Sequence, residues 1–432
     1  MEFSQEAKFA LQIIQSTNQN LFITGKAGTG KSTLLEHIRN LPDQNMIVLA
    51  PTGIAAINVK GETIHSFFKL KPGYELDEAY NARLNKKKTS KYRAIKTILI
   101  DEISMVRADI LDAIDVFLKR TRDVNQAFGG VRMIFFGDLY QLPPVVNKQN
   151  EIYFYQNYKT PYFFSAHVFK QTDLFSEAFS LTKIELKTIY RQTDKKFVDI
   201  LNGIRENTIS YDQLSELNKR VIANYSGNNS DEFFIHLMST NAGAQNINNS
   251  KLFQLEGDIT EFKASKQGKI GNLQPNEEHI CVKKGAQVMF INNDYKRRWV
   301  NGTLGVISKI SKEFDESGAE LEILYVKLEN GKEVKVSKHT WDISKYSFKD
   351  GVFTREEIGT FTQIPLKLAW AITIHKSQGK TFEHVVIDLE KGSFAHGQTY
   401  VALSRCTSLE GIILKRAIKH SDIITDKLVM SY

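Results

Sequence analysis

Short, continuous runs of apolar residues recur along the first half of the chain, and each stops at a polar or glycine-rich turn. They predict four strands, at 21–24, 46–50, 97–100 and 131–136. Between the last two, apolar residues repeat with helical spacing, at Ile110, Leu111, Ile114, Phe117 and Leu118. Continuous apolar runs are typical of parallel strands buried on both faces. Strands that alternate with helices in this way indicate an α/β domain.

The second half repeats this pattern around a segment of different character. Apolar runs at 233–238, 384–389 and 411–414 predict strands of a second α/β domain. From about 281 to 363 the runs are short and alternate apolar with polar residues, and Asn301-Gly302 and Asn330-Gly331 supply hairpin turns. The segment therefore predicts an all-β insert, a small barrel, within the second domain.

Residues 25–32 read GKAGTGKS and fit the phosphate-loop pattern G-x-x-x-x-G-K-[ST] in full. Glycines let the backbone curl so that successive N–H groups point at phosphate oxygens, and the following helix adds the positive end of its dipole. Lys31 is expected to bridge the β- and γ-phosphates, and Ser32 to ligate Mg²⁺. The loop lies between an apolar run and a helix-compatible run, as this chemistry requires.

Two further strand ends carry polar residues that suit nucleotide hydrolysis. Asp101 and Glu102 close the run at 97–100, where Asp101 would hold Mg²⁺ and Glu102 would orient and deprotonate the attacking water. Alone, such a pair usually marks a solvated strand end, but a phosphate loop upstream makes it an NTPase signal. Gln141 follows the next strand and is a candidate sensor of the γ-phosphate; the alternative is an ordinary proline-rich strand exit.

Composition narrows the class of protein. The 432 residues include 57 Lys and Arg against 49 Asp and Glu, a net charge of +8, with 42% hydrophobic and 25% charged residues, as in ordinary folded proteins of two to four domains. No run approaches the roughly 20 apolar residues that cross a bilayer. The polar start and the two cysteines, Cys281 and Cys406, do not suit a signal peptide or a disulfide framework. We expect a cytoplasmic protein without membrane partners.

The positive charge is partly clustered. The stretch from Arg83 to Lys96 has seven basic residues and no acidic one, and Tyr295 to Trp299 reads YKRRW. Each could guide DNA phosphates, or be an ordinary solvated surface.

Nine segments together resemble the PIF (petite integration frequency) family of superfamily one DNA helicases, relatives of the RecD-like enzymes. They are GKAGTGKS at Gly25, APTGIAA at Ala50, TIHSFF at Thr63, IDEISM at Ile100, FGGVRMIFFGDLYQLPPV at Phe128, IYRQ at Ile189, WVNGT at Trp299, TIHKSQGKTF at Thr373 and YVALSRC at Tyr400. They cover nearly the whole chain in a specific order. The family's signature helix is matched only loosely, by residues 111–122.

The resemblance implies two RecA-like P-loop NTPase domains with ATP in the cleft between them. The first would span 1–178, with a small basic insert at about 61–96. The second would span 179–280 plus 364–432, with an SH3-like β-barrel inserted at 281–363. The expected cofactor and substrate are Mg²⁺ and ATP.

The resemblance also assigns residues. Gln5 would read the adenine edge, and the phosphate loop would contribute Gly25, Ala27, Gly28, Thr29, Gly30, Lys31, Ser32 and Thr33. Catalysis would use Lys31, Glu102, Gln141 and two arginine fingers from the second domain, Arg191 and Arg405. DNA contacts would come from Pro51, Thr52, Gly53, His65, Phe67, Thr240, Asn241, Thr373, His375 and Lys376. Taken singly, Phe67 is equally read as a core residue and Thr240 as a helix N-cap.

The function that follows is an ATP-dependent helicase that moves 5′ to 3′ on single-stranded DNA, with roles in DNA replication, repair, recombination or telomere-type maintenance. Expected partners are single strands and single–double strand junctions, with G-quadruplex DNA and RNA–DNA hybrids in addition. We expect a monomer in solution and, in a prokaryote, association with the nucleoid. The alternatives are a DNA-stimulated ATPase that remodels protein–DNA complexes without unwinding, a non-hydrolysing DNA-binding scaffold, and an RNA-directed enzyme.

Overall fold

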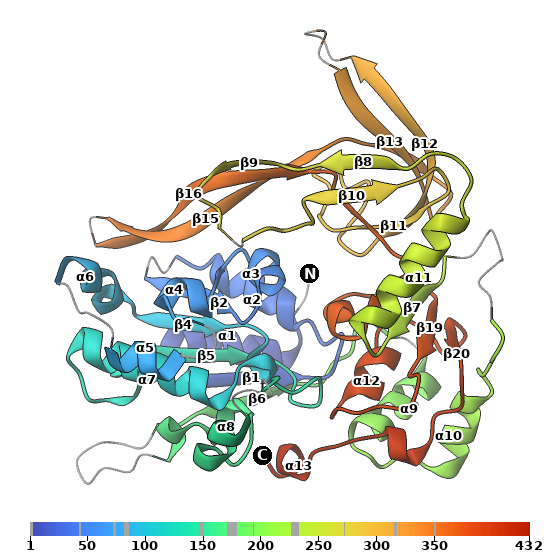
Figure 1. The fold of residues 1–432 in the computed structure, drawn as a ribbon. Coiled ribbons are helices and arrows are strands. Elements are labelled where there is room, and N and C mark those ends of the chain that lie inside the picture. The colour runs from blue at the N-terminus through green and yellow to red at the C-terminus, as the bar shows by residue number, and fades with distance from the viewer. Residues whose placement is uncertain are drawn as a thin grey trace. The chain divides into compact units, whose positions relative to one another are not determined.

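The chain forms two compact units (Figure 1), one of residues Met1–Arg191 with Ser344–Ile358 and the other of Gln192–Ile343 with Gly359–Tyr432. The structure is a computed structural model. It describes residues 3–42, 45–71, 75–81, 86–146, 151–170, 179–192, 194–225, 233–271, 273–314, 318, 320–349 and 351–432.

The first unit is built on a six-stranded sheet in the order β3-β2-β4-β5-β1-β6, in which every neighbouring pair is parallel. The strands are β1 (Leu21–Gly25), β2 (Met46–Ala50), β3 (Glu62–Thr63), β4 (Thr97–Ile100), β5 (Arg132–Phe136) and β6 (Thr182–Leu186). The four predicted strands are thus confirmed. Their apolar side chains are buried on both faces, which explains why the runs do not alternate.

Helices flank this sheet. They are α1 (Gln5–Ser16), α2 (Lys31–Arg39), α3 (Gly53–Asn58), α4 (Ile64–Phe68), α5 (Glu75–Asn81), α6 (Lys86–Ala94), α7 (Ala108–Arg122) and α8 (Glu151–Asn157). The helix predicted from the spacing at 110–118 is α7, and it buries those apolar residues. Helix α1 begins at an N-cap, Ser4, whose hydroxyl accepts a hydrogen bond from the N–H of Ala7 at 3.3 Å.

The end of the first unit differs from the expected boundary at 178/179. Strand β6 pairs in parallel with β1 over its whole length, from Leu21 opposite Thr182 to Gly25 opposite Leu186, so it completes the first sheet. The unit then ends at Arg191. Because β6 is an edge strand with mostly exposed side chains, it lacks the apolar run that announces the inner strands. Residues 171–178, just before the expected boundary, lie outside the described residues.

The second unit contains a four-stranded parallel sheet in the order β18-β7-β19-β20. Its strands are β7 (Ile235–Met238), β18 (Ala371–Thr373), β19 (Val385–Asp388) and β20 (Ile412–Leu414). Its helices are α9 (Lys195–Arg205), α10 (Tyr211–Asn218), α11 (Asn241–Gln254), α12 (Gln398–Leu403) and α13 (Lys427–Ser431). The strands predicted at 233–238, 384–389 and 411–414 are confirmed as β7, β19 and β20.

The β insert is confirmed but is wider than 281–363. Its strands are β8 (Thr260–Lys263), β9 (Ser265–Gly268), β10 (His279–Val282), β11 (Gln287–Phe290), β12 (Leu304–Phe314), β13 (Glu320–Leu328), β14 (Glu333–Val336), β15 (His339–Lys349), β16 (Val352–Gln363) and β17 (Leu366–Leu368). Strand β8 pairs with β10, and β17 pairs with β11, so pairing partners lie on both sides of the expected limits. Asn330-Gly331 does turn the chain from β13 to β14. The SH3-like form of the insert stays a prediction.

The turn of the β15–β16 hairpin groups with the first unit. The hydroxyl of Tyr346 accepts a hydrogen bond from the N–H of Val48 at 3.1 Å, and the N–H of Tyr346 donates to Glu62 at 3.1 Å. Strand β3 pairs with β2 only at Leu49 and Ala50. The tyrosine hydroxyl therefore satisfies a backbone donor of β2 that the short edge strand does not reach.

Candidate nucleotide and nucleic-acid sites

The phosphate loop joins β1 to α2 and is held closed by its own lysine. The Nζ atom of Lys31 donates to the carbonyl oxygens of Gly25 at 2.6 Å and Lys26 at 3.0 Å. The hydroxyl of Thr29 also donates to Lys26, at 2.9 Å. Helix α2 then begins at Lys31, with Ser32 exposed in its first turn. The loop therefore presents a helix N-terminus and an ammonium group at one place, as phosphate binding requires.

Gly28 lies against the segment that carries Arg191. Its carbonyl accepts a hydrogen bond from the N–H of Tyr190 at 2.8 Å. Its φ is +81°, and a Cβ built on it would lie 2.5 Å from the Cβ of Arg191, so only glycine fits. Arg191 is the last residue of the first unit, beside the phosphate loop, whereas we expected it to come from the second domain. The reason is that β6 belongs to the first sheet and the segment after it to the first unit.

Asp101 and Glu102 lie directly after β4. Burial, and next the charge of Glu102, raise the pKa of Asp101 to about 7, while the charge of Lys31 acts in the opposite direction. Glu102 has φ 50° and ψ 46°, a left-handed conformation that is rare for a residue with a long side chain. A pair of carboxylates whose ionised forms destabilise each other suits a divalent cation, so Asp101, with the exposed hydroxyl of Ser32, fits Mg²⁺.

The other first-unit residues assigned to the nucleotide are placed as follows. Gln141 is 6% exposed and lies after β5, and its N–H donates to the carbonyl of Asp138 at 3.0 Å. Gln5 is exposed at the first position of α1. Ala27 is buried, and Thr33 is half-buried in the first turn of α2. Their contacts with a nucleotide stay predictions.

Arg405, the other expected finger, is 1% exposed and lies inside the second unit. Its Nε donates to the carbonyl of Val401 at 3.0 Å, and its Nη1 is 3.4 Å from the carbonyls of Ser377 and Lys380. Its Nη2 donates to the hydroxyl of Ser404 at 2.9 Å. In this structure the guanidinium thus holds the backbone after β18, and its contact with a nucleotide stays a prediction.

Two residues of the IYRQ segment were not selected from the sequence. The side-chain amide of Gln192 is buried and donates to the carbonyls of Ser404 at 3.2 Å and Cys406 at 3.0 Å, on either side of Arg405. Tyr190 is 57% exposed, and its ring lies 3.6 Å from the position that a Cβ of Gly30 would occupy. Both residues could have been selected from the sequence, because they stand next to Arg191 in the family segment IYRQ.

The expected DNA contacts include a similar helix start in each unit. After β2, the Thr52 hydroxyl caps α3 by accepting from the N–H of Ala55 at 3.2 Å. After β7, the Thr240 hydroxyl caps α11 by accepting from the N–H of Gly243 at 3.1 Å. Pro51, Gly53 and Asn241 beside these caps are at least partly exposed. Both helix starts therefore offer N–H groups that suit a backbone phosphate.

The segment after β18 carries the remaining second-unit contacts. Thr373 is buried, and its hydroxyl accepts from the N–H of Lys376 at 3.3 Å, while Lys376 itself is exposed. Burial lowers the pKa of His375, so its ring is neutral at pH 7 and can donate one hydrogen bond.

Phe67, an expected DNA contact, is a core residue in this structure, which corrects our expectation. It is 1% exposed, and its ring packs edge-on against Phe68, Tyr92 and Tyr346 at centroid distances of 5.0, 5.7 and 5.9 Å. The packing therefore supports the alternative that Phe67 is a core residue. His65, two residues earlier, is half-buried and stays a candidate contact.

Cations in both basic clusters are engaged within the protein. In the stretch from Arg83 to Lys96, residues 83–85 lie outside the described residues. The Nζ atom of Lys91 lies 4.5 Å from the ring centroid of Tyr92, and Arg93 donates to the carbonyl of Thr121 at 3.0 Å. In the other cluster, Arg298 pairs with Asp294 at 2.8 Å.

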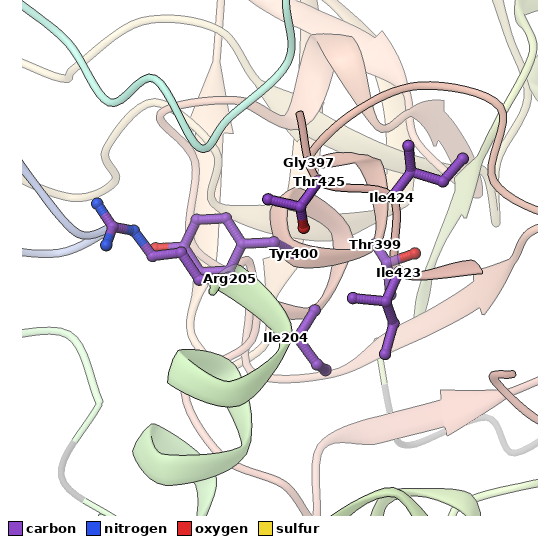
Figure 2. A pocket seen from close by; sticks show the side chains of 8 residues that line it. All are labelled: Ile204, Arg205, Gly397, Thr399, Tyr400, Ile423, Ile424 and Thr425. Atoms are coloured by element: carbon purple, nitrogen blue, oxygen red, sulfur yellow. The ribbon is translucent and has the colours of Figure 1, made fainter. Parts of the chain in front are cut away.

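A separate cavity in the second unit is too small for a nucleotide (Figure 2). It measures about 10 Å³ and is lined by Ile204, Arg205, Gly397, Thr399, Tyr400, Ile423, Ile424 and Thr425. Such a volume holds one water molecule at most. Among the helices of the described residues, none has the length and apolar character needed to span a membrane.

The parallel sheet, the phosphate loop after its first strand and the acid pair after β4 define a P-loop nucleoside triphosphatase with two RecA-like units. A sequence profile of the PIF1-like helicases matches residues 3–215. The chain is 31% identical over 441 residues to the ATP-dependent DNA helicase Pif1 of Bdellovibrio bacteriovorus, covering 100% of this chain and 92% of that protein. The chain therefore belongs to the PIF1-like helicase family.

Two solved structures of a Bacteroides Pif1 are similar over the whole chain. The complex with ADP-AlF4 is 36% identical with a TM-score of 0.86, and it covers 100% of this chain and 96% of that one. The complex with single-stranded DNA is 37% identical with a TM-score of 0.68 and the same coverage.

Proposed function

We propose that this protein is an ATP-dependent DNA helicase that moves along single-stranded DNA and separates the duplex ahead of it. The single observation that carries the proposal is that the phosphate loop with Lys31 follows β1 and the acid pair at Asp101 follows β4, at the same edge of one parallel sheet. The phosphate cradle and the acid pair are therefore one site. The names of the relatives, and the nucleotide and DNA in the solved complexes, support the same activity.

In hydrolysis, Lys31 would exchange its two carbonyl acceptors in the loop for the β- and γ-phosphates. Glu102 would orient a water molecule and accept its proton as the water attacks the γ-phosphate. Arg191, already beside Gly28, would stabilise the charge that develops on the transferred group. Ser32 and Asp101 would hold Mg²⁺, which when bound stabilises negative charge on the phosphates.

DNA would be held by its backbone. The capped helix starts at Thr52 and Thr240 offer N–H groups to phosphates, and Lys376 offers an exposed positive charge. Such contacts carry no sequence information, which suits an enzyme that must move from one nucleotide to the next.

Finer properties follow from the family resemblance. We propose 5′-to-3′ movement, action at forks, on RNA–DNA hybrids and on G-quadruplex DNA, a monomeric state in solution and, in a prokaryote, association with the nucleoid. Duplexes with a single 5′ or 3′ tail test the polarity, and unwinding of only the 3′-tailed duplex would contradict it. Inactivity on a folded guanine-rich strand would remove the G-quadruplex proposal.

The central test is Glu102→Gln, with Glu36→Gln as the matched control, because Glu36 is 62% exposed on α2 of the same unit. Loss of the base should reduce DNA-stimulated ATP turnover by about 10²- to 10⁴-fold while nucleotide and single-strand binding persist. Unwinding of a forked duplex should stop. Normal turnover in Glu102→Gln would contradict the mechanism, and turnover without unwinding in the unmodified protein would support the remodelling ATPase instead.

A further inference from the structure

Three lysines of the second unit gather around the segment that follows β18. Lys367 lies in β17 of the insert, Lys376 in the short helical turn after β18, and Lys380 four residues later. The positive charge of Lys376 lowers the pKa of Lys367, and that of Lys367 lowers the pKa of Lys380, in both cases after the larger effect of burial. Backbone geometry points the same way: Lys367 lies opposite Met289 of β11, and the next residue, Phe290, accepts a hydrogen bond from the N–H of Gly302 at 2.9 Å. A Cβ built on Gly302 would lie 3.9 Å from the Cβ of Lys380, so β17, this turn and Lys380 lie together.

Lys380 is fixed in place by the insert. Its Nζ donates to the side-chain oxygen of Asn301 at 2.7 Å, and Asn301 lies in the turn that leads into β12. An ammonium group has three N–H donors, so two remain for another acceptor. Lys367 and Lys380 are both half-buried, so neither side chain extends freely into solvent as surface lysines do.

The repulsion is not balanced by a direct ion pair. Within the described part of the chain, neither Lys367 nor Lys380 has a carboxylate within 4.0 Å, although the charge of Glu277 acts on Lys367 from further away and more strongly than that of Lys376. Burial and Lys367 together lower the pKa of Lys380 to about 8. Because partly desolvated like charges destabilise one another, an anion bound between these lysines would be strongly favoured.

We propose that Lys367 and Lys380 bind one phosphodiester group of the DNA strand, next to the group expected at Thr373 and Lys376. The proposal rests on the proposed function, since it extends the same DNA-binding surface. A backbone phosphate is favoured because the site is continuous with exposed Lys376 and because lysine binds phosphate as a point charge without reading bases. The insert, through Lys367 and Asn301, thereby becomes part of the strand-binding surface.

The test is the salt dependence of binding to an oligothymidylate strand, measured by fluorescence anisotropy. Each phosphate neutralised on a single strand contributes about 0.7 to the slope of log affinity against log salt. Replacing both lysines by glutamine should lower this slope by about 0.7 in total, and Lys367→Gln or Lys380→Gln alone by part of that amount, whereas Lys380→Arg should keep it. Lys332→Gln removes the same charge from an exposed turn of the insert and should leave the slope unchanged. Melting temperatures establish that each variant is folded.

A second measurement needs no neutral variant. The affinity of the unmodified protein should fall as the pH rises from 7 to 9, while that of Lys380→Arg, which stays charged, should fall less. Unchanged slopes in both glutamine variants, or equal pH profiles, would overturn this inference while the helicase proposal stands. A protein that does not bind the strand at all would instead contradict the proposed function.

Discussion

The Nη1 atom of Arg405 lies 3.4 Å from the main-chain oxygen of Lys380 and 3.4 Å from that of Ser377. The residue expected to act on ATP therefore holds, in this structure, the segment that carries the expected DNA contacts His375 and Lys376. The guanidinium is 1% exposed, so the protein's own oxygens surround it in this structure. If Arg405 also contacts ATP, as the resemblance implies, this one side chain would connect the nucleotide with the segment proposed to bind DNA.

Arg405→Lys should therefore affect DNA binding even without nucleotide. Lysine keeps the charge but lacks the planar fork that reaches several carbonyls. We expect single-strand affinity without ATP to fall about threefold to tenfold, and DNA-stimulated turnover to fall by about 10³ if the arginine also acts as a finger. Arg416→Lys, at an ion pair with Asp422 elsewhere in the second unit, is the control. Unchanged nucleotide-free binding would show that Arg405 does not hold the segment.

Gly28→Ala should abolish nucleotide binding through crowding against Arg191. Gly257 is the matched position, because its φ is +85° and nothing lies within 4 Å of an added Cβ. Both alanines carry the left-handed backbone cost of about 1–2 kcal/mol, so Gly257→Ala isolates that cost. We expect a larger loss of thermal stability in Gly28→Ala, and loss of ATP binding only there. Equal effects of the two substitutions would mean that the contact with Arg191 has no influence.

Substitutions at Phe67 and His65 should have different effects, the first on stability and the second on DNA binding. Phe67→Leu removes core volume and should cost about 1–2 kcal/mol of unfolding free energy while single-strand affinity stays unchanged. His65→Ala should weaken strand binding with little effect on the melting temperature. The pair is measured by thermal unfolding and by anisotropy with the same oligonucleotide. Weaker strand binding by Phe67→Leu, with unchanged stability, would restore Phe67 as a DNA contact.

Glu329→Gln should stabilise the protein above neutral pH. Burial, and next the charge of Glu383, raise the pKa of Glu329 from 4.5 to about 7, and its Oε1 is buried without a hydrogen-bond partner. The folded state therefore holds a proton that the unfolded state has lost, and stability falls as the pH rises from about 4.5 to about 7. Glutamine has no charge to bury, so the substitution removes this loss of stability. The gain in unfolding free energy at pH 8 should reach at most about 3 kcal/mol, and it should vanish near pH 4.

The exposed Glu410 offers the control for this pH effect. The change in melting temperature caused by Glu410→Gln should be the same at pH 8 as at pH 4. A gain for Glu329→Gln that is equal at both pH values would mean that the side chain stays ionised, or stays neutral, throughout.

The inner strands and the phosphate loop could be predicted because their signals are local. Strands β1, β2, β4 and β5 are continuous apolar runs, and the loop is defined by consecutive residues. Strand β6 was not recognised because half-exposed edge strands resemble loops in sequence. Likewise, β8 and β17 belong to the insert only through pairing with β10 and β11, which no local pattern reveals.

The site was predicted as a set of residues, but not as a set of contacts. The acid pair and Lys31 follow from spacing, whereas the burial of Arg405 and Phe67 depends on packing between distant segments. Gln192 shows the same limit, since its role lies in two carbonyls more than 200 residues further along the chain. Family segments locate such residues without indicating which atoms they contact.

The left-handed backbone of Glu102 has a consequence for protein engineering. Glycine or asparagine would fit φ 50° and ψ 46° with less strain, so a search for more stable sequences would favour replacing this residue. The resulting protein should melt at a higher temperature and, by the proposed mechanism, lose ATP turnover. Redesign of this chain for thermal stability therefore has to exempt this position, because stability alone would select against the proposed general base.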